Sequence, residues 1–271
     1  PEIQRYFDVE VDYQISLIPS ATPYSRNGIF SGLTLDEIQN QHPELWEKMK
    51  GDEHSMNREE KTLLREQLDR IGFRDKTLHY SKVAVAREGK SFLSKLGDRM
   101  GTDVISLVVN FVDLLTHHRA HSDLLQEMMP DESGYRSMVK TWFSNSWLLE
   151  VLRILSESDY QVILTSDHGS VRVKKAVRVA GDRDTSSGIR YKYGWNLNCS
   201  DKHALVIKQP AKYHLPEMGK GTDYLIAKED RYFVYPTEYH KYRESLDNSF
   251  QHGGISMEEM LVPVLTLTPC P

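Results

Sequence analysis

Two short, mainly apolar segments constrain the fold of this chain of 271 residues more than any other feature. Residues 104–112 read VISLVVNFV and residues 160–165 read YQVILT. Neither segment shows the regular alternation of polar and apolar side chains that is typical of a strand with one exposed face. Both are therefore predicted to be strands that are buried on both faces, as in a parallel sheet covered by helices.

The rest of the chain alternates between strand-like and helix-like segments. Further strands are expected at Val11–Ile18, Ala204–Ile207, Tyr224–Ala227 and Leu261–Leu267, and the apolar spacing of Gly134–Ser156 predicts a long helix. Such alternation favours an α/β fold with a mostly parallel central sheet that is flanked by helices.

Local signals mark helix starts but no domain boundary. Thr34–Glu37 and Asn57–Glu60 have the pattern of capping boxes, in which a short polar side chain and a glutamate cap the first turn. The polar stretch of residues 42–61 is interpreted as an insertion. Because no stretch rich in Pro, Gly and Ser divides the chain, residues 1–271 are expected to form a single domain.

Composition excludes several classes of protein. The 34 basic and 39 acidic residues give a net charge of −5, which excludes a uniformly basic nucleic-acid-coating protein but not a local basic patch. Cys199 and Cys270 are too few for a disulfide framework. The sequence contains no apolar run of roughly 18 residues, the length that a membrane span requires. We therefore expect a cytoplasmic protein without a membrane partner.

The chain begins with Pro1 and not with methionine. We therefore expect it to be a fragment of a longer protein.

Three polar clusters follow predicted strands, where ligands of open α/β sheets bind. Asp113 and His117 are four residues apart, so on a helix they would share one face. Asp167 and His168 come directly before Gly169, which permits a sharp turn. His252 precedes two glycines near the C-terminus. Carboxylate and imidazole groups in such positions can bind divalent metal ions, although solvated histidines and ordinary turns are the competing interpretations.

A fourth cluster surrounds Thr22, which follows the predicted strand Val11–Ile18 and precedes Pro23. Proline favours the first turn of a helix, so Thr22 is expected at a helix N-terminus, where free N–H groups attract anions. A threonine there can be a nucleophile if its pKa is lowered, for example by a metal ion. The competing interpretation is that Ser20 or Thr22 only caps the helix.

The order of these clusters resembles the alkaline phosphatase superfamily, and most closely its PglZ branch, as found at the C-terminal end of PorX-type response regulators. The matching stretches span nearly the whole chain. They are LIPSATPYSRNGIFSGL (17–33), VVNFVDLLTHHR (108–119), ILTSDHGSVRV (163–173), VAGDRDTSSGIRYKYG (179–194) and QHGGISMEEMLVPV (251–264).

The resemblance implies an alkaline-phosphatase-like fold, a threonine nucleophile and two divalent metal ions, with zinc favoured over manganese. Thr22 would be the metal-bound nucleophile. Asp113, His117 and His252 would hold one ion, and Asp167, His168 and the Thr22 oxygen would hold the second. Family members usually have one more ligand, an Asp after the first strand. Nothing in this chain matches it, so the first strand is expected to be missing and the second metal site to be incomplete.

The region after the DHG turn suggests a substrate class. Residues 172–192 contain seven basic and two acidic residues, a local charge of 7 − 2 = +5, with aromatic residues beside them. Cations and aromatic rings together can bind a phosphate backbone and stack bases. Arg26, Arg190 and Lys192 are the predicted substrate-binding residues. A solvated basic hairpin is the competing interpretation.

The sequence therefore predicts a metal-dependent phosphohydrolase, a phosphodiesterase for oligonucleotides or cyclic nucleotides rather than a monoesterase. The family resemblance implies that it serves as the output domain of a two-component response regulator, with signalling proteins as partners. The alternative is a non-catalytic, metal-bound interaction module. The oligomeric state is left open, and a homodimer is compatible with the sequence.

Overall fold

The computed structural model describes residues 2–51, 56–119, 122–181, 186, 188–235, 243 and 246–270. The chain divides into two compact units, each built from separate stretches of sequence. The first unit contains residues 1–14, 75–166 and 263–271, and the second contains residues 15–74 and 167–262. The interpretation of the chain as a single domain stays a prediction.

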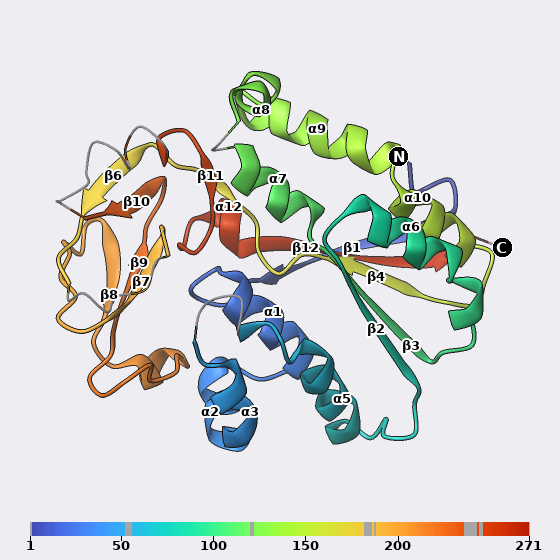
Figure 1. The fold of residues 1–271 in the computed structure, drawn as a ribbon, viewed down its shortest axis with the longest axis horizontal. Coiled ribbons are helices and arrows are strands. Elements are labelled where there is room, and N and C mark those ends of the chain that lie inside the picture. The colour runs from blue at the N-terminus through green and yellow to red at the C-terminus, as the bar shows by residue number, and fades with distance from the viewer. Residues whose placement is uncertain are drawn as a thin grey trace. The chain divides into compact units, whose positions relative to one another are not determined.

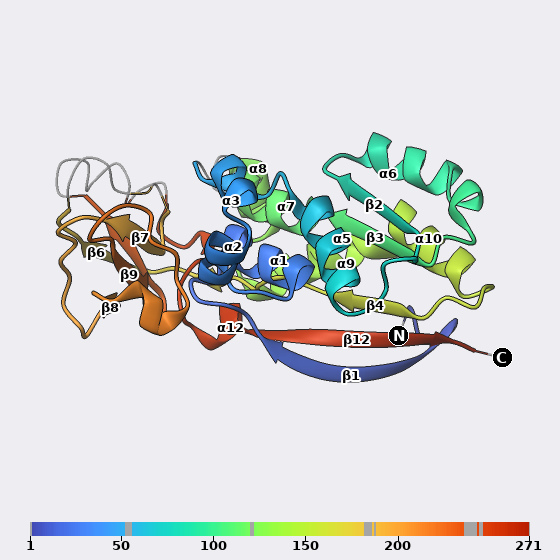
Figure 2. The same cartoon turned by 90° about the horizontal axis from the view of Figure 1, so that it is seen from below.

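The first unit contains two groups of strands (Figure 1). In one group the order is β1 (Phe7–Ile15), β12 (Leu261–Pro269) and β4 (Val162–Thr165), with β12 antiparallel to β4. Figure 2 shows β1 and β12 running alongside one another. In the other group β2 (Leu78–Val83) and β3 (Val104–Val109) form a parallel pair.

Helices of the first unit pack on the β2–β3 pair through an apolar cluster that includes Val83, Phe92 and Trp147. Burial of these side chains is the main contribution to the stability of this unit. The helical elements are α6 (Ala86–Ser94), η1 (Gly97–Arg99), α7 (Phe111–Arg119), α8 (Asp123–Met128), α9 (Glu132–Ser144) and α10 (Trp147–Leu155).

Three predicted elements have other bounds in the structure. The strand predicted at Val11–Ile18 is β1, which spans Phe7–Ile15. The predicted helix Gly134–Ser156 is two helices, because Asn145 ends α9 and Ser146 occupies the N-cap of α10. Short polar side chains of this kind compete for backbone hydrogen bonds and favour helix ends. The predicted strand at 104–112 stops at Val109, since α7 begins at Phe111.

The second unit has helices at its N-terminal side and short strands in its C-terminal part. The helical elements are α1 (Thr22–Ser31), α2 (Leu35–Gln41), α3 (Pro43–Met49), α5 (Glu60–Arg70), η2 (Pro210–Tyr213) and α12 (Met257–Met260). The strands are β5 (Val171–Arg172), β6 (Lys175–Arg178), β7 (Tyr191–Gly194), β8 (Ala204–Ile207), β9 (Asp223–Ala227), β10 (Arg231–Val234) and β11 (Phe250–Gln251).

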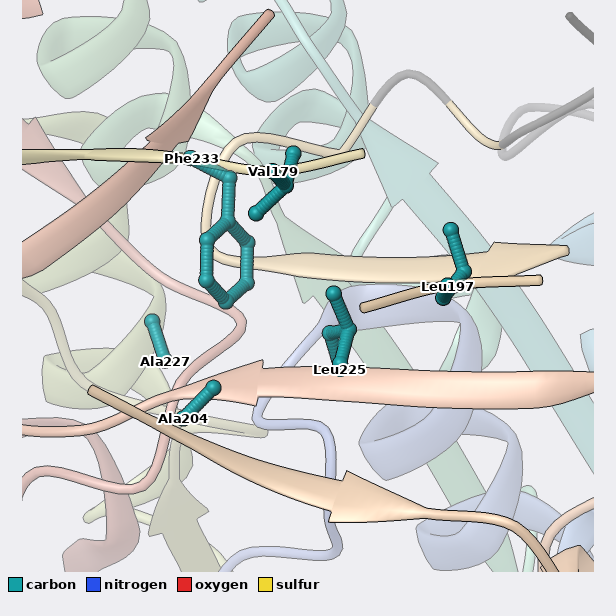
Figure 3. Close-up of a cluster of buried hydrophobic side chains, with 6 residues drawn as sticks. All are labelled: Val179, Leu197, Ala204, Leu225, Ala227 and Phe233. Carbon is teal, nitrogen blue, oxygen red and sulfur yellow. The ribbon is translucent and has the colours of Figure 1, made fainter. Parts of the chain in front are cut away.

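Pairing of these strands builds the scaffold of the second unit. β9 lies between β7 and β8 and is antiparallel to both, β6 and β10 are parallel, and β5 and β11 are antiparallel. Figure 3 shows the apolar core that these strands share. It consists of Val179, Leu197, Ala204, Leu225, Ala227 and Phe233.

The α/β class that the sequence predicts is confirmed, with helices and sheets in both units. Parallel pairing occurs in the short pairs β2–β3 and β6–β10, alongside antiparallel pairs. None of the helices among the described residues combines the length and the apolar content that crossing a membrane requires.

Of the two predicted capping boxes, one is confirmed and one is wrong. Thr34 and Glu37 form the predicted box at the start of α2. Asn57 does not cap α5, which begins at Glu60 with Glu59 at its N-cap. The Asn57 side chain instead donates a hydrogen bond to the carbonyl of Thr22, 3.4 Å away. Within the predicted insertion, Pro43–Met49 forms α3, and residues 52–55 lie outside the described part of the chain.

Gly89 on α6 is expected to be essential for the packing of the first unit. A Cβ atom at this position would lie 2.0 Å from the Trp147 ring on α10. We expect Gly89→Ala to destabilise the protein by about 1–3 kcal/mol, because overpacking outweighs the better helix propensity of alanine. The midpoint of urea unfolding measures the effect.

Gly97→Ala is the matched control, because a Cβ atom at Gly97 would meet nothing within 4 Å. Its midpoint should stay within about 0.5 kcal/mol of the parent. Equal midpoints for the two variants would contradict the tight packing of α6 against α10.

Candidate active site at the start of α1

Thr22 begins α1, and its hydroxyl is directed to His168. The Thr22 Oγ1 and His168 Nε2 atoms are 3.0 Å apart. The N-cap of α1 is Ala21, and no side chain caps the helix, so the interpretation of Thr22 or Ser20 as a simple cap does not hold. Thr22 thus carries a hydroxyl that is held by an imidazole at the positive end of a helix dipole.

The other ring nitrogen of His168 fixes its tautomer. His168 Nδ1 lies 2.9 Å from the carbonyl oxygen of Gly169. A carbonyl oxygen can only accept a hydrogen bond, so Nδ1 carries the proton in the neutral ring. The Nε2 lone pair therefore faces the Thr22 hydroxyl, where it can accept a proton or ligate a metal ion.

His252 lies against the same imidazole. The rings of His168 and His252 are stacked with their centroids 4.0 Å apart and their planes 18° apart. His168 is nearly buried, with 9% of its surface exposed. The second unit thus brings together Thr22, His168 and His252, which are far apart in the sequence.

Asp167, which directly precedes His168, is fixed by hydrogen bonds. Its Oδ1 accepts a hydrogen bond from the His168 amide at 3.2 Å, and its carbonyl accepts one from Ser16 Oγ at 2.8 Å. Ser16 Oγ is also 2.7 Å from Ser25 Oγ on α1. Two serines therefore link the DHG turn to the helix that carries Thr22.

Asp113 and His117 lie on α7 of the first unit. Their side chains contact one another, with His117 Nε2 3.3 Å from Asp113 Oδ1. The predicted helical spacing is confirmed, since both residues lie within Phe111–Arg119 and are four positions apart. This unit therefore contributes a carboxylate and an imidazole that are already adjacent.

The residues present fit a divalent metal ion. Carboxylate and imidazole groups suit Zn²⁺ and Mn²⁺. Two atoms that each lie about 2 Å from a tetrahedral zinc ion are roughly 3.3 Å apart, and the distance between Thr22 Oγ1 and His168 Nε2 is 3.0 Å. The second unit supplies this pair together with the carboxylate of Asp167, which lies 3.7 Å from His168 Nε2.

The prediction that Arg190 contacts substrate is wrong. Its side chain is 0% exposed and forms a two-point ion pair with the equally buried Glu259. Arg190 Nε and Nη2 donate to the two carboxylate oxygens at 2.8 and 2.7 Å. The remaining donors reach the carbonyls of Arg231 and Glu229. No face of the guanidinium is left for a ligand.

Lys192 requires the same correction. It is 4% exposed, and its Nζ donates to the Ser186 carbonyl at 3.0 Å. The same ammonium lies 4.8 Å from the centroid of the Tyr235 ring, a cation–π arrangement. An ammonium enclosed in this way stabilises the β7 region and does not contact a bound phosphate.

Arg26 is held on the buried face of α1. Its Nε donates to Glu60 Oε1 at 2.5 Å, and the two side chains are 14% and 1% exposed. This ion pair connects α1 to the first residue of α5. A contact between Arg26 and a substrate stays a prediction.

Sequence reasoning did not anticipate the tyrosines that support Thr22. Tyr24 on α1 is buried and meets Tyr191 edge-on, with ring centroids 5.7 Å apart. Burial raises the pKa of Tyr24 well above its ordinary value, and burial likewise raises the pKa of Tyr224. Both phenols therefore stay protonated, and they form a neutral contact surface for α1. Only the abundance of tyrosine in residues 191–193 hinted at this cluster.

Part of the predicted basic region surrounds a pocket of about 420 Å³. Lys175 and Arg231, both at its wall, pair with Asp230 and Glu229 respectively. Arg183, which belongs to the predicted region, lies outside the described residues. The pocket is lined by Lys175, Ala176, Val177, Arg178, Cys199, Ser200, His203 and Arg231.

Residues 2–267 match the model described as the BREX system PglZ alkaline phosphatase-like domain. The chain belongs to the PglZ family. None of the curated proteins compared with this PglZ domain matches it.

Solved structures similar to this PglZ domain include phosphonoacetate hydrolase from Sinorhizobium meliloti 1021. Its complex with phosphonoacetate is 12% identical, with 97% of this chain and 82% of that chain covered and a TM-score of 0.49. Its complex with phosphonoformate is 13% identical, with 67% of this chain covered and a TM-score of 0.41. The match to the latter spans half of that chain's length.

Truncation of Arg190 tests its assignment as a structural residue. Arg190→Ala leaves the buried Glu259 carboxylate without its counter-ion, so we expect the PglZ domain to lose about 3–5 kcal/mol of stability. Urea unfolding measures this loss. If Arg190 bound substrate instead, Arg190→Ala would raise KM and leave the stability of the domain unchanged.

Lys174→Ala is the control from the same basic region, because Lys174 is exposed. We expect its stability to lie within about 0.5 kcal/mol of the parent. Equal stability of the Arg190 and Lys174 variants would contradict the structural assignment.

Proposed function

We propose that this PglZ domain is a metal-dependent phosphodiesterase whose nucleophile is Thr22. The observation that carries the proposal is the contact between Thr22 Oγ1 and His168 Nε2, 3.0 Å apart at the first residue of α1. Membership in an alkaline phosphatase-like family supports the hydrolysis of phosphoesters as the general class of reaction.

In this proposal Asp113, His117 and His252 bind one divalent ion. Asp167 and His168, with the Thr22 oxygen, bind a second ion. When bound, such ions lower the pKa of the Thr22 hydroxyl and neutralise the charge on the phosphate oxygens.

The protein's own residues define the direction of attack. His168 Nδ1 is held by the Gly169 carbonyl, so Nε2 lies on the side of Thr22 Oγ1, and the two atoms would share one ion. The Thr22 hydroxyl gives its proton to water, and its oxygen bonds to phosphorus as the bond from phosphorus to the leaving group breaks. The leaving alkoxide takes up a proton from water and departs as an alcohol. Water then cleaves the bond between Thr22 and the phosphoryl group, which releases a phosphate monoester.

The N-terminus of α1 is suited to hold the phosphate during this reaction. The helix spans ten residues from Thr22, so its first N–H groups and its dipole present partial positive charge beside the nucleophile. Because Ala21 occupies the N-cap, no side-chain oxygen competes with the substrate for these donors.

The basic pocket supports a diester with more than one phosphate. Lys175, Arg178 and Arg231 line it in the same unit as Thr22. An oligonucleotide could place one phosphate near Thr22 and further phosphates on these cations, whereas a small monoester has no group to bind there. This is why we favour oligonucleotides over monoesters, and cyclic nucleotides are the second class of diester in the proposal.

The resemblance to PorX-type response regulators supports a further part of the proposal. The domain would act as the output module of a two-component regulator, and its partners would be signalling proteins. A non-catalytic, metal-bound interaction module is the alternative, and the variants described next separate the two.

Thr22→Ala is expected to abolish hydrolysis of bis(p-nitrophenyl) phosphate and of short oligonucleotides. Loss of a nucleophile that acts together with its neighbours lowers kcat by about 10⁴-fold or more. Thr22→Ser is the matched control, because it keeps a hydroxyl and should retain measurable turnover. Elemental analysis of zinc in each variant shows whether the metal ions are still bound.

If Thr22→Ala hydrolyses these substrates as fast as the parent, the assigned nucleophile is wrong. If neither the parent nor Thr22→Ser turns over any diester while zinc is bound, the domain is a non-catalytic interaction module and the enzyme proposal is wrong.

Reversal of charge at the pocket tests the choice of substrate. We expect Lys175→Glu combined with Arg178→Glu to raise KM for a 20-nucleotide single strand roughly tenfold, with kcat unchanged. KM for bis(p-nitrophenyl) phosphate should not change, because this substrate has one phosphate. The effect on the long substrate should shrink as salt is added.

Lys61→Glu is the control, since Lys61 is exposed on α5 of the same unit and does not line the pocket. If Lys61→Glu raises KM for the 20-nucleotide strand as much as the pocket variant does, the effect reflects overall charge. That result would contradict a role for the pocket.

A further inference from the structure

We propose that Glu259, Arg190 and Ser20 are positioning residues that hold the imidazole of His168 against Thr22 and that of His252 against His168. They touch neither substrate nor metal ion in this proposal, and they act by fixing the loops that carry the two histidines. The inference rests on the proposed function for its catalytic meaning, but its structural claim can be tested without turnover.

Ser20 connects the loop of His252 directly to the start of the nucleophile helix. Its Oγ accepts a hydrogen bond from the Gly253 amide at 3.1 Å and donates one to the Gly254 carbonyl at 2.8 Å. Ser20 is 0% exposed and lies two residues before Thr22. One hydroxyl therefore sets the distance between the His252 loop and α1.

Glu259 holds the same loop from its other side. Its Oε1 accepts a hydrogen bond from the Gly254 amide at 2.8 Å. Its Oε2 accepts from the Ser256 amide at 3.1 Å and from Ser256 Oγ at 2.8 Å. This is a capping box at the start of α12, and it extends beyond the helix to the glycine two positions after His252.

Arg190 makes this buried carboxylate stable as an anion. The two-point pair with Glu259 provides the opposite charge, and both side chains are 0% exposed. The guanidinium also donates to the carbonyls of Glu229 and Arg231, which fixes its own orientation. A buried charge pair persists only when its remaining donors and acceptors are satisfied, and here they are satisfied by backbone groups.

Glu259 also reaches the histidine that contacts Thr22. The Gly169 amide donates to the Glu259 carbonyl at 2.9 Å, and Gly169 directly follows His168. A Cβ atom at Gly169 would lie 2.0 Å from the carbonyl oxygen of Glu258, so the turn approaches this backbone as closely as a glycine permits. One residue thus fixes both histidine loops.

Close packing explains why two glycines follow His252. A Cβ atom at Gly254 would lie 2.3 Å from Arg190 Nη2, and Gly253 has a φ of +107°, which favours glycine. The loop must pass over the guanidinium at a distance that no larger residue allows. Its path, and with it the stacked position of His252, is set by the ion pair below it.

Ser20→Ala is the most direct test, because it removes only the hydroxyl. Ser31→Ala is its matched control. Ser31 is 1% exposed at the last residue of α1, and its Oγ likewise accepts from an amide, that of Leu33, and donates to a carbonyl, that of Asn27. Both variants lose two backbone contacts of a buried serine, but only one of them touches the histidine loop.

Two measurements read out the position of the histidines. The first is the NMR signal of the His168 and His252 ring protons in metal-free protein, which the stacking shifts upfield. The second is the dissociation constant for Zn²⁺, measured by competition with a chromophoric chelator. We expect Ser20→Ala to move the ring signals towards those of free histidine and to weaken zinc binding about tenfold or more.

Ser31→Ala should leave the ring signals and the zinc affinity unchanged at a similar midpoint of thermal unfolding. Identical ring signals in Ser20→Ala and the parent would overturn the proposal. So would changes of equal size in the two serine variants.

A second variant keeps the test decisive if Ser20→Ala does not fold. Arg190→Met combined with Glu259→Gln removes both buried charges together, which proteins tolerate better than the loss of one. It should unfold cooperatively but show the same displaced ring signals and weaker zinc binding. A folded double variant with the parent's ring signals would overturn the role of the ion pair.

The outcomes separate this inference from the proposed function. If Ser20→Ala shows displaced ring signals but the parent hydrolyses no diester, the positioning role is supported and the proposed enzymatic function is wrong. If Ser20→Ala shows the parent's ring signals, and the parent hydrolyses diesters while Thr22→Ala does not, the enzymatic function is supported and the positioning role is wrong.

Discussion

The ion pair between Arg190 and Glu259 is the interaction on which the candidate site of the second unit depends. Neither side chain is exposed, so the cost of removing both charges from water is recovered only through complete pairing. The carboxylate accepts from the amides of Gly254 and Ser256, and the guanidinium donates to backbone carbonyls. Because the buried charges must be fully paired, the backbone at Gly254 and Ser256 has to stay within hydrogen-bond distance of Glu259. This requirement fixes the loop that carries His252.

The chemistry of the site depends on side chains that this scaffold brings into contact, Thr22 and His168. Thr22 meets His168 because α1 begins where the DHG turn passes, and the serines at positions 16 and 25 connect the two. His168 directs one nitrogen to the backbone, so its other nitrogen is available to the hydroxyl. Orientation of a neutral imidazole by a backbone carbonyl is how proteins prepare such a ring for a metal ion or a proton.

Local patterns in the sequence were sufficient for the α/β fold class. The apolar runs at residues 104–112 and 160–165 predicted strands, and β3 and β4 form there. The prediction that both are buried on both faces is wrong for β4, where Ile163 is 57% exposed, because β4 pairs antiparallel with β12 and is not covered on both sides. The sharp turn predicted after His252 is present, with a φ of +107° at Gly253. Element ends were less predictable, because they depend on local competition, as where Asn145 and Ser146 divide one predicted helix. The partner of Arg190 was beyond prediction, since Glu259 lies 69 residues away and only the folded chain brings the two together.

The cations after the DHG turn show why charge along a sequence does not define a surface. In the sequence they form one basic region, but folding divides them between two physical roles. Arg190 and Lys192 lie inside, where each satisfies a carboxylate, a carbonyl or an aromatic ring. Lys175 and Arg178 stay outside on β6, beside the pocket. The positive charge beside the pocket is therefore separate from the buried positive charge near the site, and the two can be changed independently.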